Sequence, residues 1–201
     1  YLALAKYESE RVFVIMKRAF DLFAGVILLL SLVIILLFIA IAIRRTSKGS
    51  VLYWSDRIGK NNKIFKMPKF RSMLIDTPAV ATHLLDNPNV YLSPIGGFLR
   101  STSLDELPQL FSVLRGDMSF VGPRPALYNQ DDLISFRTEK GVDKLLPGIT
   151  GWAQVNGRDE LSIPDKVALD VEYLNRQSFW FDMKILWMTF LKVMRRNGVS
   201  H

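Results

Sequence analysis

Two adjacent carboxylates, Asp105 and Glu106, are the side chains of this sequence best placed to do chemistry. Ser103 precedes Glu106 at the spacing of a capping box, which predicts a helix over residues 103–114 that begins at this point. The N-terminus of a helix offers free N–H groups and a partial positive charge, so it accepts phosphate. The spacing therefore predicts a carboxylate and a bound phosphate held side by side.

Two arginines flank this predicted helix. Arg100 lies just before it, and Arg124 follows it between Pro123 and Pro125. The prolines restrict the backbone around Arg124, and a guanidinium can grip a phosphate through two parallel hydrogen bonds. Helix capping and a surface turn are the ordinary interpretations of the carboxylate pair and of the proline-flanked arginine. Phosphate binding becomes the better interpretation of both because a membrane segment accompanies them.

The composition excludes several other kinds of catalytic site. The chain has 201 residues, no cysteine and two histidines, His83 and His201. This excludes thiolate nucleophiles and cysteine-based zinc sites, and it makes a Ser-His-Asp triad or a multi-histidine metal site unexpected. The sequence contains neither the glycine-rich phosphate loop, nor the dinucleotide-binding glycine pattern, nor an Asp-x-Asp pair. Any catalysis must therefore rest on carboxylates, basic side chains, hydroxyls and the backbone.

The positive charge of the chain is concentrated in one segment. The formal net charge is +7, and residues 44–72 contain nine basic residues against one acidic residue, a local charge of +8. A basic patch of this kind is typical of a solvated face or of a nucleic-acid footprint. The segment that precedes it in the chain favours a membrane surface instead.

Residues 22–43 form an apolar run with no charge and no proline. As a helix this run is roughly 33 Å long, enough to cross a hydrocarbon core of ~30 Å. Basic residues flank the run on both sides, which is typical of a helix that returns to the cytoplasmic face; the absence of a helix breaker favours a full span. In either arrangement the basic patch lies at the membrane surface, where it can bind anionic lipid headgroups.

The rest of the chain predicts a small α/β architecture, mostly helical with short strands. We expect a membrane segment over residues 1–48, a cytoplasmic catalytic core over 49–178, and a C-terminal amphipathic helix over 179–201. Tryptophans and basic edges make this last helix either an interfacial membrane helix or a terminal helix packed on the core. Within the core we expect strands at 51–54 and 64–70, a helix at 164–175, and glycine- and proline-rich loops at 116–125 and 146–158.

Four ordered motifs resemble the bacterial sugar transferase family, the monotopic phosphoglycosyl transferases that act on polyprenyl phosphate. The motifs are FRSM (70–73), STSLDELPQL (101–110), RGDMSFVGPRPAL (115–127) and PGITGWAQVNGRD (147–159). The resemblance extends over roughly residues 15–198. It departs from the family in one place, because the Ser-Pro pair that commonly breaks the apolar segment is missing from this one.

The resemblance implies an activity and a set of site residues. Such enzymes transfer a sugar 1-phosphate from a UDP-sugar to undecaprenyl phosphate and release UMP. Asp105 would be the nucleophile and a Mg²⁺ ligand, with Glu106 as the second residue of the catalytic pair. The family pattern also assigns substrate or phosphate contacts to five further positions, Arg71, Arg100, Arg124, Pro125 and Arg158.

The resemblance also implies partners and a location. An N-acetylated amino sugar is the expected donor sugar, undecaprenyl phosphate and membrane lipid are the other partners, and nucleic acid is not a partner. The expected location is the bacterial inner membrane with the catalytic core on its cytoplasmic face. A membrane-anchored binding protein and a UDP-releasing glycosyltransferase are the alternatives, and the nucleotide product, UMP, UDP or none, distinguishes them. The sugar, the pathway and the oligomeric state are left open.

Overall fold

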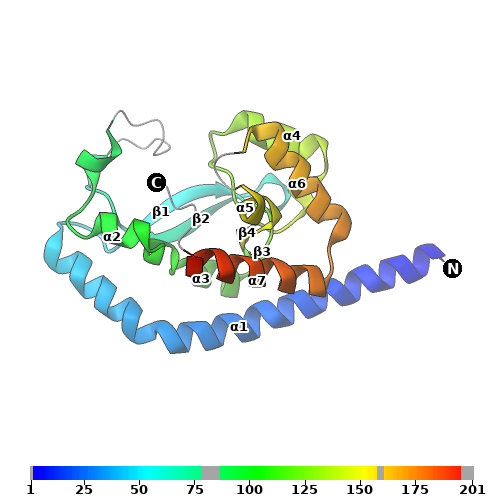
Figure 1. The fold of residues 1–201 in the computed structure, drawn as a ribbon, viewed down its shortest axis with the longest axis horizontal. Coiled ribbons are helices and arrows are strands. Elements are labelled where there is room, and N and C mark those ends of the chain that lie inside the picture. The colour runs from blue at the N-terminus through cyan, green and yellow to red at the C-terminus, as the bar shows by residue number, and fades with distance from the viewer. Residues whose placement is uncertain (1, 78–86, 158–160, 196–201) are drawn as a thin grey trace.

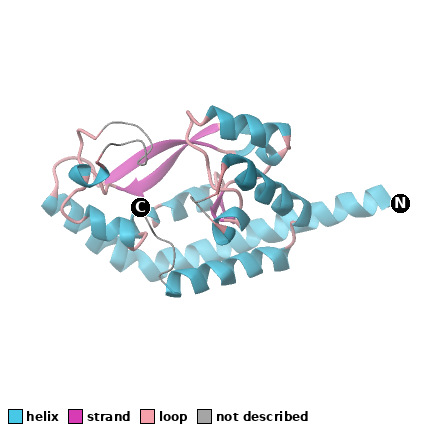
Figure 2. Ribbon diagram, turned by 45° about the horizontal axis from the view of Figure 1, so that its top comes forward, coloured by secondary structure: helices cyan, strands magenta, loops and turns pink. Residues whose placement is uncertain are grey.

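The structure, a computed structural model, describes residues 2–77, 87–157 and 161–195. It is mostly helical with short strands, as the sequence predicts (Figure 2). The helices are α1 Leu2–Thr46, α2 Gly96–Ser101, α3 Gln109–Arg115, α4 Asp131–Glu139, α5 Trp152–Asn156, α6 Ile163–Arg176 and α7 Phe179–Arg195. The strands are β1 Leu52–Ile58, β2 Ile64–Phe70, β3 Ser119–Val121 and β4 Gly148–Thr150. Short 3₁₀ turns lie at η1 Lys60–Asn62, η3 Pro88–Tyr91, η4 Leu104–Glu106 and η5 Val142–Lys144.

The strands form two separate two-stranded sheets. β1 and β2 pair antiparallel, with Leu52 opposite Phe70 and Ile58 opposite Ile64, which confirms the two predicted strands and extends the first. β3 and β4 pair in parallel across a long stretch of sequence. The expectation of loops over 116–125 and 146–158 was therefore wrong in part, since these segments contain β3, β4 and α5.

Close backbone approach explains the glycines that suggested loops there. A Cβ atom on Gly122 would lie 2.3 Å from the carbonyl oxygen of Leu146. A Cβ on Gly148 would lie 2.1 Å from the backbone nitrogen of Gly122. Neither distance is possible without moving backbone, so the glycines allow the two segments to pack together.

Helix α1 is one continuous helix that extends beyond the apolar run at both ends. Figure 1 shows it along the lower edge of the molecule, with α3 and α7 beside it, and both helices contact it. Its part from Arg11 to Thr46 is long and apolar enough to cross a membrane, and no other helix in the described ranges meets that test. A narrow stripe that includes Asp21, Gly25, Ile39 and Ile43 is buried against the body, while most of its apolar side chains are exposed.

The N-terminal end of the apolar run is anchored by buried polar contacts. Lys17 forms an ion pair with Asp182 of α7 and donates to the carbonyl of Val121 at 2.8 Å and to the hydroxyl of Tyr173 at 3.2 Å. One turn further, the Asp21 carboxylate accepts from the backbone N–H of Phe120 at 3.1 Å. These contacts tie α1 to β3 and α7.

The C-terminal end of the same run packs on a different part of the same body. Ile39 and Ile43 share an apolar cluster with Phe70 at the end of β2 and with Leu99 of α2. The chain on both sides of the apolar run is therefore held to the same folded body.

Helix α7 has features expected of both interpretations that the sequence left open. Phe181, Asp182 and Ile185 are buried, and Phe181 and Ile185 belong to the main core cluster with side chains of β2, α3 and β3. The opposite face carries large exposed apolar side chains, namely Trp180, Trp187, Phe190, Val193 and Met194. One face thus packs on the core, and the other has the character of a membrane-interface helix.

Candidate functional site

The carboxylate pair does not lie at the start of a helix. Asp105 and Glu106 belong to the 3₁₀ turn η4, and α3 begins only at Gln109. Ser103 has a left-handed backbone (φ 55°) and its side chain caps nothing, so the predicted capping box was wrong, and the helix predicted over 103–114 is present only from Gln109 onward. Pro108, at the N-cap of α3, has no N–H with which to continue the hydrogen bonding of η4 into that helix. The site therefore does not use a helix N-terminus to hold phosphate.

The turn η4 brings the two carboxylates against the end of the β1–β2 hairpin. Asp105 is buried, with 9% of its surface exposed, and the Glu106 carboxylate is nearly as enclosed. Lys69 of β2 donates to Glu106 Oε1 at 2.7 Å, and Arg124 donates to the same oxygen from 3.3 Å. Three segments far apart in the sequence thus converge on one carboxylate.

The electrostatics of the two carboxylates differ. Burial raises the pKa of Asp105 above its ordinary value; Lys69 and Arg100 oppose the shift, and the Glu106 carboxylate adds to it. Burial also lowers the pKa of Lys69, against the attraction of Glu106 and Asp105. Glu106 is hydrogen-bonded to two cations, whereas the Asp105 carboxylate is poorly solvated. Weak solvation leaves the Asp105 carboxylate better able to attack an electrophile.

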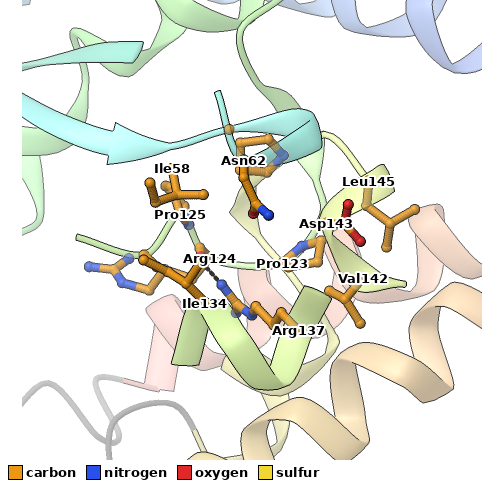
Figure 3. Close-up of a pocket in the computed structure, with 13 residues that line it drawn as sticks. Ile58, Asn62, Pro123, Arg124, Pro125, Ile134, Arg137, Val142, Asp143 and Leu145 are labelled. Atoms are coloured by element: carbon orange, nitrogen blue, oxygen red, sulfur yellow. Dashed lines mark hydrogen bonds between the residues drawn. The ribbon is translucent and has the colours of Figure 1, made fainter. Parts of the chain in front are cut away.

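The backbone on either side of the Arg124–Pro125 peptide bond is held by two further arginines. Arg137 of α4 donates to the carbonyl of Arg124 at 2.8 Å (Figure 3), and Arg57 of β1 donates to the carbonyl of Pro125 at 3.2 Å. Arg137 is itself buried and bonds through two nitrogens to Asp170 of α6, at 2.7 and 2.9 Å. The segment that carries Arg124 is therefore rigid before any substrate arrives.

Figure 3 shows a shallow pocket on one side of this segment. Pro123, Pro125 and aliphatic side chains line it, and the Arg137 guanidinium lies at its edge. The guanidinium of Arg124 points away from Arg137, on the side of Glu106. The Pro-Arg-Pro segment thus presents backbone to the pocket and the Arg124 cation to the carboxylate pair.

The structure brings together most of the residues that the sequence singled out. Arg124 donates a hydrogen bond to Glu106. The charges of Glu106 and Arg100 both act on Asp105. Arg71 behaves differently, because its guanidinium donates to the Ser47 hydroxyl at 2.9 Å, just beyond the end of α1. Pro125 contributes a carbonyl rather than its ring to these contacts.

One predicted site residue, Arg158, lies outside the described residues.

Two residues of the site, Lys69 and Arg57, escaped the sequence analysis. Both were counted only as members of the basic segment 44–72, which was assigned to the membrane surface. Strand alternation gave a partial signal, because it places Lys69 and Arg57 on one face of the hairpin and Lys66 on the other. Lys69 pairs with Tyr53 and Arg57 with Phe65, whereas the exposed Lys66 pairs with Asp56. Which face of the hairpin meets η4 depends on the fold and was not readable from the sequence.

The carboxylate pair is compatible with a magnesium ion. Within the described parts of the chain there is no group of three or more His, Cys, Asp or Glu side chains that could cage a metal. Mg²⁺ does not need such a cage, because it commonly binds through one or two carboxylates, water and substrate phosphate. Asp105 and Glu106 supply that number of carboxylates.

A model of the bacterial sugar transferase family matches residues 12–196. An undecaprenyl-phosphate glucose phosphotransferase of Komagataeibacter xylinus is 43% identical over 194 residues, covering 90% of this chain and 36% of that protein. The uncharacterized sugar transferase EpsL of Bacillus subtilis is 42% identical over 189 residues, covering 92% of this chain and 91% of EpsL. A UDP-glucose:undecaprenyl-phosphate glucose-1-phosphate transferase of Escherichia coli is 41% identical over 186 residues, 89% of this chain and 40% of that protein. The chain thus spans less than half the length of two of these relatives and nearly all of EpsL.

Proposed function

The chain belongs to the bacterial sugar transferase family, and on that premise we propose that it transfers a sugar 1-phosphate from a UDP-sugar to undecaprenyl phosphate. The products are the lipid-linked sugar diphosphate and UMP. The named activities of two relatives support this reaction. The observation that carries the proposal is the buried Asp105 beside a Glu106 that is bonded to Lys69 and Arg124.

In the proposed mechanism Asp105 is the nucleophile. A carboxylate oxygen of Asp105 bonds to the phosphorus that carries the sugar, and the bond from that phosphorus to the bridging oxygen breaks. The electron pair of the broken bond leaves on the phosphate of UMP. The acyl phosphate then passes the phospho-sugar to the phosphate of the lipid, which restores the carboxylate. No proton has to move in either displacement, and the described residues of the site include no histidine or cysteine.

The cations around the carboxylate pair have distinct proposed roles. Lys69 and Arg124 face the position of the transferred phosphoryl group and neutralise its charge, and Arg100 helps to keep Asp105 ionised. Asp105, with Glu106 beside it, would hold Mg²⁺, which supplies charge neutralisation for the phosphates when bound. Arg71 and Arg158 remain proposed substrate contacts.

A nucleotide-release assay tests the proposed function. The purified chain is incubated with undecaprenyl phosphate and, in parallel, UDP-glucose, UDP-galactose or UDP-N-acetylglucosamine. We expect UMP and a lipid-linked sugar diphosphate. The named activities of the relatives favour a glucose donor, and the sequence analysis favours an N-acetylated amino sugar, so the donor panel decides between them. Release of UDP would instead support a glycosyltransferase, and no nucleotide release from any donor would support a binding protein.

We further propose that the apolar run of α1 does not span the membrane. Lys17, shortly before the run, contacts Val121 and Asp182, and Ile39 and Ile43 at its C-terminal end pack with Phe70 and Leu99. All four contacted residues belong to one folded, polar body that cannot lie on both sides of a bilayer. Because α1 is one continuous helix held to this body near both ends of the run, we propose that it lies in one face of the membrane, together with the exposed face of α7. The proposed location is the cytoplasmic face of the inner membrane.

Cysteine labelling tests this topology. Because the sequence contains no cysteine, each single-cysteine variant of it carries one thiol for the reagent. Single variants Glu8→Cys and Lys48→Cys place one thiol beyond each end of the apolar run. We expect a membrane-impermeant reagent to label both thiols in inverted vesicles and neither in intact spheroplasts. A periplasmic marker protein serves as the control. Labelling of Glu8→Cys from the periplasmic side alone would show that α1 spans.

A further inference from the structure

Arg57 is a guanidinium at the site that the proposed mechanism does not yet use. It lies on β1, where its Nε donates to the Ser55 hydroxyl at 3.0 Å and its Nη1 donates to the carbonyl of Pro125 at 3.2 Å. A guanidinium has five N–H donors in a planar fork. Within the described parts of the chain, these two contacts leave the Nη2 side of the fork available for a ligand.

Two like charges lie close together here. The pKa of Arg57 is lowered to about 10, first by burial and next by the positive charge of Arg124, while Glu106 opposes the shift. Lys69 is also buried and shares Glu106 with Arg124. Glu106 acts on all three cations, and Asp105 acts on Lys69 as well, so three positive charges face two carboxylates. A bound anion would relieve the repulsion between the two guanidinium groups.

The contacts also order these residues along the site. Glu106 is the chain neighbour of Asp105, and Arg124 donates to the Glu106 carboxylate at 3.3 Å. Arg57 contacts the next residue after Arg124, donating to the carbonyl of Pro125 at 3.2 Å. Along this series of contacts from Asp105, Arg57 therefore comes after Arg124.

We infer that Arg57 binds the phosphate of the departing nucleotide, on the side of the site opposite Asp105. This inference rests on the proposed function. In an in-line displacement at phosphorus, the entering and leaving oxygens lie on opposite sides of the transferred group. With Asp105 as the entering group, the bridging oxygen and its negative charge develop toward Arg124 and Arg57. Arg57 would contact the phosphate that remains on UMP, and Arg124 would contact the phosphoryl group that is being transferred.

Three variants separate phosphate binding from support of the Pro125 backbone. Arg57→Gln keeps a donor for the Pro125 carbonyl but removes the charge. Arg57→Lys keeps the charge but loses the planar fork. Lys66→Gln is the matched control, because it removes a cation from the exposed face of the same hairpin, where Lys66 pairs with Asp56.

The readouts are the dissociation constant for UMP and the turnover number, both measured on the full chain in detergent, with a thermal melt of each variant. For Arg57→Gln we expect UMP affinity to fall about 10- to 100-fold, the range for one charge-assisted hydrogen-bonded contact. Turnover should fall as well, because the leaving group loses its counter-charge. Arg57→Lys should be intermediate, and Lys66→Gln should resemble the wild type.

Unchanged UMP affinity in a folded Arg57→Gln would overturn the inference and leave Arg57 a backbone support. If Arg57→Gln does not fold, Arg57→Lys decides: weakening of UMP binding by about fivefold or more supports the contact, and unchanged binding contradicts it. Failure of the proposed function looks different, since the wild-type chain itself would then release UDP or no nucleotide.

Discussion

Replacing Asp105 with Asn should abolish UMP release and the covalent phospho-sugar adduct, with turnover falling by roughly 10³-fold or more, as is typical when a nucleophile is removed. Asparagine has nearly the same shape but lacks the anionic oxygen that would attack phosphorus. Intact-mass measurement after incubation with the UDP-sugar alone, without lipid acceptor, should show the adduct on the wild type and not on the variant. Retained turnover in Asp105→Asn, or a wild type that never forms the adduct, would refute the nucleophile assignment.

Stability and pH distinguish a catalytic Asp105 from a structural one. Burial raises the pKa of Asp105, so its ionised form is unfavourable in the folded state, and this cost is present at pH values above the folded-state pKa. Asp105→Asn should therefore melt at or above the wild-type temperature at neutral pH while losing activity. In the wild type, kcat/KM should fall at acid pH with a midpoint above the ordinary pKa of an aspartate, because the Asp105 carboxylate must be ionised to attack. Asp132→Asn, an exposed carboxylate on α4, should change neither property.

The motif residues of this site are local in sequence, and that is why they could be identified. Asp105, Glu106 and Arg124 stand in short, recognisable runs, and the structure brings Glu106 and Arg124 into contact. Their partners were less accessible, because Lys69 and Arg57 reach the site only through the pairing and facing of the β1–β2 hairpin. The error at Ser103 has the same origin: a correct spacing for a cap was overridden by a left-handed residue and by Pro108.

The membrane helix and the site share one framework. Lys17 of α1 bonds the carbonyl of Val121, and the next residues along the chain are Gly122 and the Pro-Arg-Pro segment. Just past the C-terminal end of the helix, Ser47 bonds Arg71, two residues beyond Lys69. The backbone segments that carry Arg124 and Lys69 are therefore each tied to α1, one through Lys17 and the other just past Thr46. Under the proposed function, the cations that meet the lipid phosphate are positioned by the same helix that is proposed to lie in the membrane.

The second large effect is expected at Arg137, which does not face the carboxylate pair. Replacing Arg137 with Met leaves Asp170 buried without its ion pair and leaves the carbonyl of Arg124 without a donor. Removing one partner of a buried pair typically costs about 3–5 kcal/mol of unfolding free energy. Turnover should fall as well, because the backbone that aims Arg124 loses one of its two arginine supports. Lys140→Met, which breaks an exposed pair at the end of α4, should cost less than about 1 kcal/mol.

A double variant separates the loss of stability from the loss of the backbone support that positions Arg124. Arg137→Met with Asp170→Leu removes the uncompensated charge, so most of the lost stability should return, while the carbonyl of Arg124 still lacks its donor and turnover should stay low.

Acid pH offers a second check on the single variant. Burial already raises the pKa of Asp170 against the opposing effect of Arg137, and without Arg137 that pKa rises further. The stability deficit of Arg137→Met is then present above the folded-state pKa and shrinks as the pH falls through it. Chemical denaturation across pH, together with the UMP-release assay, measures both effects. Full turnover in the double variant would show that Arg137 acts on stability alone.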